Sequence, residues 1–450
     1  MGALTLAREA QYSGAVSWLA LALLWPLSAS AQSADDRPAS ASAAPPATSA
    51  APRRGAVPQS VQVLDELIER LTDAPLYRDN DAELLLDGPQ THAAMLDAIA
   101  AAEHHVHLET YIFADDEVGA EFAAALAAKA REGVAVRVIF DAIGSRGGAD
   151  GFWMGLQDAG VAVREFNPPD PAQDQNPFDI DTRDHRKLLI VDGRVAFTGG
   201  INIDRNYVKP SDAVGGTSNS SGWRDTHIRI AGPAVAAFQQ LFVSLWEQLD
   251  EPLGALYTPP PRQLDQGDTL VRVLSSVGGD EEVSEIWIAY QAAAKVAADR
   301  IWITQSYFAP DDELMAAITE AAARGVDVRI LVAGFSDSDL LLSASRAYYD
   351  DLLEAGVSVF ESQEHILHAK TMVVDDYWST VGSSNLDYLS FLHNHEANAV
   401  ILGSKFAAQL EDVFVADLEN AVQINRERWG RRSLWQRAKE LGSYFIRYRL

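Results

Sequence analysis

Apolar residues in this chain follow two alternating periods, one typical of helices and one typical of strands. Spacings of three and four residues predict helices over 61–72, 91–102, 118–131, 233–249, 286–297 and 314–323. Alternating or continuous apolar runs bounded by turn residues predict strands over 106–113, 134–140, 161–166, 187–191, 194–198, 226–230, 301–308 and 325–330. Strands interleaved with helices predict an α/β fold, with a mixed sheet covered on both faces.

The order of these segments repeats along the chain. Gly325-Val326-Asp327-Val328-Arg329 matches Gly133-Val134-Ala135-Val136-Arg137, and Ala355-Gly356-Val357 matches Ala159-Gly160-Val161. A repeat of this length indicates two duplicated lobes. We place them at 59–257 and 258–425, joined through the proline-rich stretch 252–262.

A polar motif is duplicated with the lobes. His185, Lys187 and Asp192 are spaced like His368, Lys370 and Asp375, and these six form the candidate catalytic set. A pair of small residues follows 14 positions after each histidine (199 − 185 and 382 − 368), and Asn202 and Asn385 follow after 17 (202 − 185 and 385 − 368). Matched offsets in matched lobes favour a single active site built from both copies.

The residue types suit an anionic substrate. In a strand, positions i and i+2 face the same side, so each histidine projects with its lysine. Histidine titrates near neutral pH, so one ring can be a nucleophile while the other is an acid. Lys187, Lys370, Asn202 and Asn385 are the candidate phosphate-binding groups, because cations and amides stabilise phosphate oxygens.

A catalytic histidine also needs a group that holds its second ring nitrogen. Within each lobe the candidates are Asp225 for His185 and Glu396 for His368. Asp192 and Asp375 end their strands, so we expect them to brace a turn rather than touch the substrate.

Two other interpretations compete with this one. Two buried histidines with unrelated neighbours would not explain the matched offsets. A metal site is disfavoured because the two lysines would repel a cation, although other histidines occur in the chain. Those considered as ligands are His104, His105, His107, His365, His393 and His395.

The ends of the chain differ from its body. Residues 1–31 combine an apolar run with Ala29-Ser30-Ala31, which predicts a signal peptide or an N-terminal anchor, and 32–58 form an Ala/Ser/Pro-rich tether. Residues 426–450 carry eight basic and two acidic residues interspersed with aromatic ones, a composition typical of a helix on an anionic membrane. The alternative is a basic helix docked on the protein's own acidic body.

Composition limits the remaining classes of function. The formal net charge is −28, which argues against a nucleic-acid partner. The chain has no cysteine, so disulfides and thiolate chemistry are excluded.

The duplicated His-x-Lys-x-x-x-x-Asp motif, with Gly-Gly or Gly-Ser and Asn downstream, resembles the phospholipase D superfamily. The bacterial cardiolipin synthase branch is the more similar one, through Trp223-Arg224-Asp225 and Asn394-His395-Glu396 among other segments. The resemblance implies two pseudo-twofold-related α/β/α lobes with the active site at their interface. It also implies phosphatidyl transfer without a metal or cofactor, through a phosphohistidine on His185 with His368 as the acid. Asp225 and Glu396 carry over as the histidine-orienting residues.

The sequence departs from that family in two respects. A signal-like segment and a tether replace the membrane-spanning segments with which such synthases commonly begin. Ser306 stands where a proline is usual.

The leading hypothesis is an exported, periplasm-facing phosphatidyltransferase that makes cardiolipin from phosphatidylglycerol at a membrane surface. A hydrolytic phospholipase D, or a transphosphatidylase on other phospholipids, is the alternative. A nuclease and a non-catalytic lipid-binding protein are weaker ones. The acceptor alcohol and the oligomeric state stay open.

Overall fold

The computed structural model describes residues 57–169, 182–208, 222–250, 252–253, 267–279, 283–336 and 339–445. All of them belong to one compact unit, which starts at Pro52. The predicted signal peptide or anchor (1–31) and nearly all of the tether (32–58) lie outside the described residues.

The first half of the chain in this unit forms the following elements. They are α2 (Gln59–Leu71), β1 (Leu76–Leu86), α3 (Asp87–Ala100), β2 (His105–Thr110), α4 (Glu117–Arg131), β3 (Ala135–Asp141), α5 (Asp150–Asp158), β4 (Ala162–Phe166), β5 (Lys187–Val191), β6 (Val195–Gly199), the 3₁₀ turn η1 (Arg205–Tyr207), β7 (Thr226–Ala231) and α6 (Val235–Leu249).

The second half follows the same plan. Its elements are β8 (Thr269–Ser276), α7 (Glu285–Val296), β9 (Arg300–Gln305), β10 (Phe308–Ala309), α8 (Asp312–Ala323), β11 (Asp327–Ala333), α9 (Asp339–Arg346), α10 (Tyr349–Ala355), β12 (Ser358–Ser362), β13 (Lys370–Val374), β14 (Trp378–Gly382), β15 (Leu386–Asp387), α11 (Tyr388–Leu392), β16 (Glu396–Leu402), α12 (Ser404–Leu418), β17 (Ala421–Gln423), α13 (Arg426–Trp429) and α14 (Leu434–Phe445).

One 15-stranded sheet runs through both halves, in the order β17-β12-β11-β9-β13-β14-β16-β8-β1-β7-β6-β5-β2-β3-β4. From β12 inward the order is β12-β11-β9-β13-β14-β16-β8, and from the other edge inward it is β4-β3-β2-β5-β6-β7-β1. Read position by position, the two series place each strand of one half where its counterpart from the duplicated sequence lies in the other half. This palindrome confirms the duplication and the pseudo-twofold relation of the lobes.

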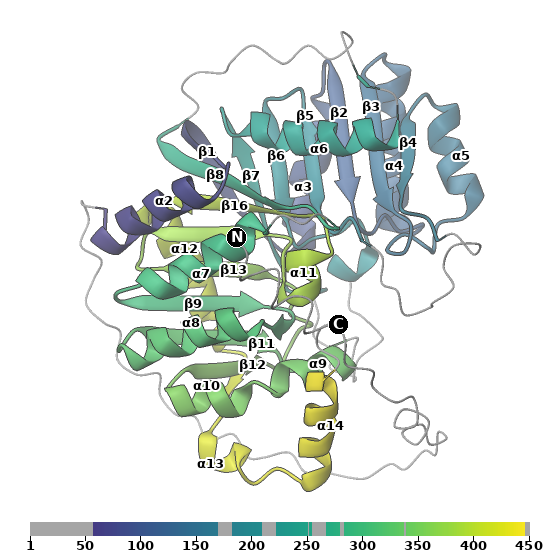
Figure 1. The fold of residues 1–450 in the computed structure, drawn as a ribbon. Coiled ribbons are helices and arrows are strands. Elements are labelled where there is room, and N and C mark those ends of the chain that lie inside the picture. The colour runs from purple at the N-terminus through teal and green to yellow at the C-terminus, as the bar shows by residue number, and fades with distance from the viewer. Residues whose placement is uncertain are drawn as a thin grey trace. The chain divides into compact units, whose positions relative to one another are not determined.

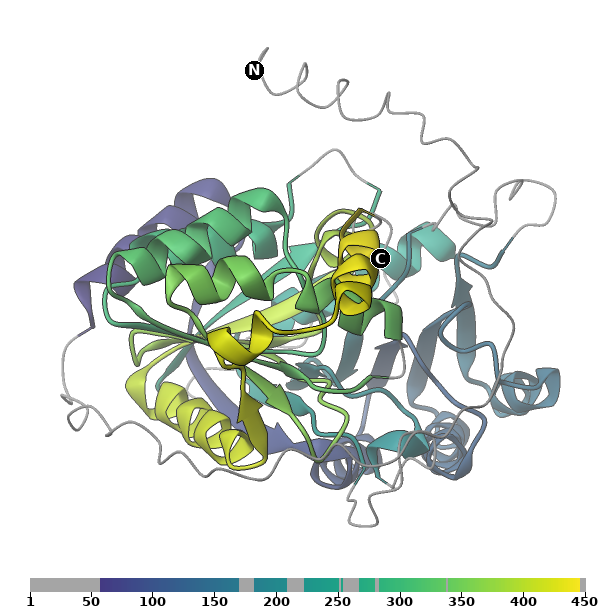
Figure 2. The ribbon, with the colours of Figure 1, turned by 90° about the horizontal axis from the view of Figure 1, so that it is seen from below.

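Helices cover both faces of the sheet, as the alternating pattern predicts. In the second half, α7, α8 and α10 lie on one face and α12 on the other (Figures 1 and 2). In the first half, α3, α4 and α5 share one apolar cluster with the strands, and α6 belongs to another with Phe238 and Trp246. The fold is therefore the expected α/β/α arrangement, repeated twice.

The duplication extends to the helix caps. Asp116 accepts hydrogen bonds from two amides of the first turn of α4, and Asp311 does the same for α8. Such carboxylates satisfy amides that a helix start leaves unpaired. The structural counterpart of Asp116 is therefore Asp311.

The lobe boundaries need one correction. Helix α2 was assigned to the first lobe, but its buried residues Val61, Leu64 and Ile68 pack into the core of the second half. Figure 1 shows α2 lying along α7. An amphipathic helix can bury its apolar face against either half, and its place in the sequence does not say which.

Strands β1 and β8 were not predicted, yet they join the halves. β1 pairs with β7 on one side and with β8 on the other, so the sheet is continuous there. Along β1, Arg78, Asp79, Asp81 and Glu83 are exposed, which hides the strand from a search for apolar alternation.

The C-terminal segment folds into two short helices. Arg432 pairs with Asp350 of α10 and with Glu440, so part of the basic surface docks on the acidic body. Trp435 stays 72% exposed. Among the described residues, no helix is both long and apolar enough to span a membrane.

Candidate active site

The two motif histidines lie where the halves exchange backbone hydrogen bonds. The amide of His185 donates to the carbonyl of His395 at 3.0 Å, and the amide of His395 donates to Arg183 at 2.9 Å. In the other copy, the amide of His368 donates to the carbonyl of Arg224 at 2.8 Å. Each histidine is thus fixed to a segment of the opposite half.

This pairing crosses the histidine–carboxylate partners. His185 Nδ1 lies 2.9 Å from Glu396 Oε1, and His368 Nδ1 lies 2.8 Å from Asp225 Oδ2. The expectation that each carboxylate serves the histidine of its own lobe is therefore wrong. Asp225 follows Arg224 and Glu396 follows His395, so the backbone bridges bring each carboxylate to the other half's ring.

The contacts define the tautomer of both rings. A carboxylate can only accept, so each Nδ1 carries the proton and each Nε2 keeps a lone pair. Burial lowers the pKa of His185, and it lowers the pKa of His368 to about 4, helped by the charge of Lys370. Both rings are therefore neutral at pH 7, as a nucleophilic nitrogen requires.

The carboxylates stay ionised although they are fully buried. Burial acts to raise the pKa of Glu396, but His185 and Lys187 lower it below its usual value. The pKa of Asp225 is lowered in the same way by His368 and Lys370, against the effect of burial. Each pair therefore holds an anion behind a neutral ring, ready to stabilise an imidazolium.

Both lysines are buried beside the histidines, as the spacing predicts. Lys187 Nζ donates to the carbonyl of His185 at 2.6 Å and lies 5.4 Å from the centre of the Tyr111 ring. Lys370 Nζ donates to Ser306 Oγ at 2.8 Å and also to the carbonyl of His368. Burial, together with the like charge of Lys370, lowers the pKa of Lys187 to about 7. An anionic ligand would relieve this repulsion between the two cations.

The two asparagines lie within the same network. Asn202 Nδ2 donates to the Tyr207 hydroxyl at 2.9 Å, and its Oδ1 accepts the amide of Ile112 at 3.2 Å. Asn385 Oδ1 accepts from Ser306 Oγ at 2.9 Å. Their binding to phosphate stays a prediction.

The terminal aspartates of the motifs brace turns, as expected, and their carboxylates bind backbone amides rather than the histidines. Asp192 accepts three amides, those of Glu103, His104 and His105, each at 2.8 Å. Asp375 likewise accepts the amides of Ala298, Asp299 and Arg300. Each aspartate lies at the far end of a five-residue strand from its histidine. The candidate catalytic set is therefore reduced to His185, Lys187, His368 and Lys370.

Several neighbours of the histidines were not foreseen. The Ser383 hydroxyl donates to Glu396, whereas at the matching Gly200 a Cβ atom would lie 2.2 Å from Asp225 Oδ1. The Tyr207 hydroxyl lies 3.2 Å from His368 Nδ1. The motif flagged Ser383 and Gly200 only for their size, and nothing in the sequence linked Tyr207 to His368.

Aromatic rings flank both histidines. Tyr111 meets His185 edge to face at 5.0 Å between ring centres, and Trp223 lies 5.4 Å from His368. These aromatic rings cover part of each imidazole. The two histidines thus share a plan but differ in their immediate partners.

A cardiolipin synthase model with a PLD-like domain matches residues 95–243 and 290–418. The chain belongs to this family. The two matched stretches lie in the two halves of the sheet, one around each histidine motif.

Relatives by sequence agree with the family model. The cardiolipin synthase of Alkalihalophilus pseudofirmus is 36% identical over 393 residues, covering 86% of this chain and 75% of that protein. The cardiolipin synthase of Listeria welshimeri is 36% identical over 376 residues, covering 83% of this chain and 76% of that protein. The prediction of a phosphatidyltransferase of the phospholipase D superfamily is thereby confirmed.

Solved structures support the fold. The phosphatidylserine synthase of Haemophilus influenzae superposes with a TM-score of 0.64 at 14% identity, over 86% of this chain and all of that one. A polyphosphate kinase of Porphyromonas gingivalis gives a TM-score of 0.52 at 13% identity, over 77% of this chain and 49% of that one.

Proposed function

We propose that this cardiolipin synthase family member joins two phosphatidylglycerol molecules into cardiolipin and releases glycerol. The observation that carries the proposal is the pair of neutral histidines, each anchored through Nδ1 to a buried carboxylate and flanked by a lysine. Two neutral imidazoles, each with a lysine beside it, suit a phosphodiester.

The first half of the reaction forms a phosphohistidine. Nε2 of His185 attacks phosphorus, and the bond from phosphorus to the glycerol oxygen breaks. That oxygen leaves with a proton from Nε2 of His368, whose protonated form the anionic substrate and Asp225 favour. Lys187, Lys370 and the two asparagines hold the non-bridging oxygens.

The second half reverses the roles. A hydroxyl of a second phosphatidylglycerol gives its proton to His368 and attacks phosphorus, and the bond to His185 breaks. If water entered instead, the product would be phosphatidic acid, as in a hydrolytic phospholipase D. The acceptor is therefore decided by which hydroxyl reaches the intermediate.

Product analysis tests this proposal. We expect purified enzyme with phosphatidylglycerol alone to yield cardiolipin and glycerol in equal amounts, and His185→Ala to yield neither. Wild-type enzyme denatured with detergent at alkaline pH should carry labelled phosphatidyl on histidine, because the phosphorus–nitrogen bond is labile only in acid, and the label should be absent from His185→Ala. Phosphatidic acid as the sole product would refute the synthase assignment, whereas plasmid cleavage would indicate a nuclease.

We also propose that the enzyme is exported and acts at a membrane surface facing the periplasm. The apolar run and Ala29-Ser30-Ala31 near the N-terminus support export. The exposed Trp435 and the exposed basic residues Arg431, Arg437 and Lys439 support membrane contact by the C-terminal segment. Cell fractionation with a periplasmic marker, followed by vesicle sedimentation, tests both statements.

A further inference from the structure

Arg224 is a buried arginine beside the His368 pair, and it is ionically bonded to both halves. Its side chain is 12% exposed. Nε donates to Asp417 of α12 at 2.9 Å, and one terminal nitrogen lies 3.3 Å from Asp87 at the start of α3. The charge of Asp417 comes from the second half and that of Asp87 from the first.

The same cluster fixes the backbone of Asp225. The terminal nitrogen of Arg224 that faces Asp87 also donates to the Asp225 carbonyl, and Asp87 Oδ1 accepts the Asp225 amide at 3.0 Å. In return, the Asp87 amide donates to the Asp225 carbonyl at 3.0 Å. Both peptide groups of Asp225 are thus held, and the Thr226 amide donates to its carboxylate Oδ1 at 2.7 Å, which keeps Oδ2 turned toward His368.

The contacts close a circuit across the interface. His368, in the second half, is held by Asp225 of the first, Asp225 is held by Arg224, and Arg224 is held by Asp417 of the second. Because the backbone of Arg224 also accepts the amide of His368, a shift of Arg224 would move both members of the catalytic pair.

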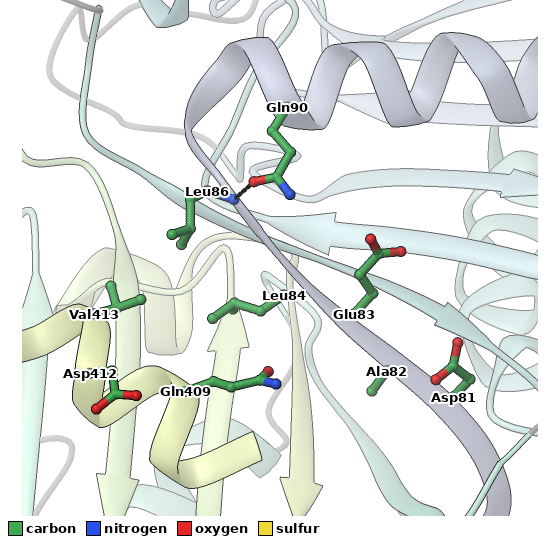
Figure 3. Close-up of a pocket in the computed structure, with 9 residues that line it drawn as sticks. All are labelled: Asp81, Ala82, Glu83, Leu84, Leu86, Gln90, Gln409, Asp412 and Val413. Atoms are coloured by element: carbon green, nitrogen blue, oxygen red, sulfur yellow. Dashed lines mark hydrogen bonds between the residues drawn. The ribbon is translucent and has the colours of Figure 1, made fainter. Parts of the chain in front are cut away.

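A groove between β1 and α12 lies beside the cluster. Figure 3 shows its walls, with Leu84 and Leu86 on β1 facing Gln409 and Val413 on α12. Asp87 directly follows Leu86, and Asp417 lies one helical turn beyond Val413. The contacts of Arg224 with Asp87 and Asp417 therefore tie the end of β1 to α12 at one end of this groove.

The His185 pair is built differently. His395 occupies the place of Arg224, and burial lowers its pKa to about 3, so it is neutral. Arg186 does donate to the Glu396 carbonyl at 3.3 Å, but its carboxylate partner Glu109 lies in the same half as Arg186. Among the described residues, an ion pair to a helix of the opposite half therefore supports the His368 pair and not the His185 pair.

We propose that Arg224 and Asp417 are positioning residues that hold the Asp225–His368 pair in the geometry for proton transfer to the leaving alcohol. The proposal rests on the proposed function, in which His368 is the acid. Neither residue touches the substrate, so both act through Asp225. An ångström of misplacement at such a pair can cost about 10²-fold in rate.

The test compares two leaving groups. One substrate is phosphatidylglycerol, whose glycerol needs a proton to leave, and the other is the 4-nitrophenyl ester of phosphatidic acid, whose nitrophenolate leaves without one. Arg224→Gln and Asp417→Asn should lower the first-turnover rate of glycerol release by about 10- to 100-fold, and that of nitrophenolate release by less than about 3-fold. The first turnover is compared because the later transfer step uses His368 as a base with either substrate. KM should change little for either substrate.

Arg229→Gln is the matched control. Arg229 lies on β7, three residues after Thr226, and pairs with exposed Asp81 and Glu83 at 3.9 and 3.8 Å. The Arg229→Gln substitution should leave the release of glycerol and of nitrophenolate unchanged. Asp417→Asn removes one charge from a partly exposed side chain, so it provides a folded variant if Arg224→Gln unfolds.

The outcomes separate the two proposals. Equal losses on both substrates, or no loss on either in a folded variant, would overturn the positioning role. Wild-type enzyme that releases neither glycerol nor nitrophenolate would overturn the proposed function itself.

Discussion

At the scale of single residues, the two histidine–carboxylate pairs differ at one matched position. Gly200 lies against Asp225, and Ser383 donates a hydrogen bond to Glu396. The duplication supplied two copies of one site, and this position makes their carboxylates unequal. A hydroxyl donor stabilises the Glu396 anion, while its absence leaves room for Asp225.

Substitutions at this position should therefore have unequal effects. In Gly200→Ala the new Cβ would lie 2.2 Å from Asp225 Oδ1, so the carboxylate must move and kcat should fall about 10²-fold. Ser383→Ala loses only one charge-assisted hydrogen bond, so we expect about a 10-fold loss. Steady-state kinetics on phosphatidylglycerol tests the order, and the reverse order would contradict it.

At the scale of elements, each motif strand is anchored by a turn at the end remote from the site. Asp192 has a φ of 54° and Asp375 a φ of 50°, a left-handed conformation that aspartate tolerates. Their carboxylates gather three amides from the loop that precedes the neighbouring strand. The spacing between histidine and aspartate in each motif thus reflects the length of the strand. One end of the strand lies beside the histidine of the site, and the other end lies beside the aspartate that holds the turn.

Asp192→Asn should lower stability and leave the chemistry intact. Replacing one acceptor oxygen by an amide group should cost about 1–3 kcal/mol of unfolding free energy, with kcat within about 2-fold of wild type. Urea unfolding and kinetics at pH 7 measure both. A large fall in kcat at unchanged stability would restore Asp192 to the catalytic set.

The pH dependence gives a second test of the same turn. Burial acts to raise the pKa of Asp192, but the three amides lower it below its usual 3.8. The stabilisation is therefore complete above the unfolded-state pKa and is lost as pH falls through the lower folded-state value. The stability difference between wild type and Asp192→Asn should accordingly shrink in acid.

At the scale of the whole molecule, the halves are interlocked rather than only adjacent. The sheet is continuous through β1 and β8, helix α2 of the first half packs on α7, and each histidine has its carboxylate in the other half. A half alone would expose the β1 or β8 edge and hold a histidine without its anion.

Each half expressed alone should thus be inactive, and the two halves expressed together should be active. We expect fragments 59–253 and 267–450, expressed together, to copurify and to make cardiolipin, because α2 and the β1–β8 pairing hold them. Each fragment expressed alone should show no activity. Activity in a single fragment would contradict the crossed pairing.

Much of the fold followed from local pattern. Strands β3 to β7 and helices α4, α6, α7 and α8 were predicted close to their observed bounds, because apolar periodicity and turn residues act over short distances. Helix α5 was missed, since Gly151 and Gly155 interrupt its pattern. Strands β1 and β8 were missed because their place at the centre of the sheet depends on partners far along the chain.

The sequence by itself determined the duplication, the family and the four candidate catalytic residues, because motif spacing within a strand fixes which side chains project together. Only the tertiary structure decided which carboxylate serves which histidine, which half holds α2, and that Arg224 ties the His368 pair to α12. Those choices depend on backbone and ion-pair contacts between segments more than a hundred residues apart (368 − 225 = 143 and 417 − 224 = 193). No local pattern encodes contacts of that kind, because either half offers chemically equivalent partners.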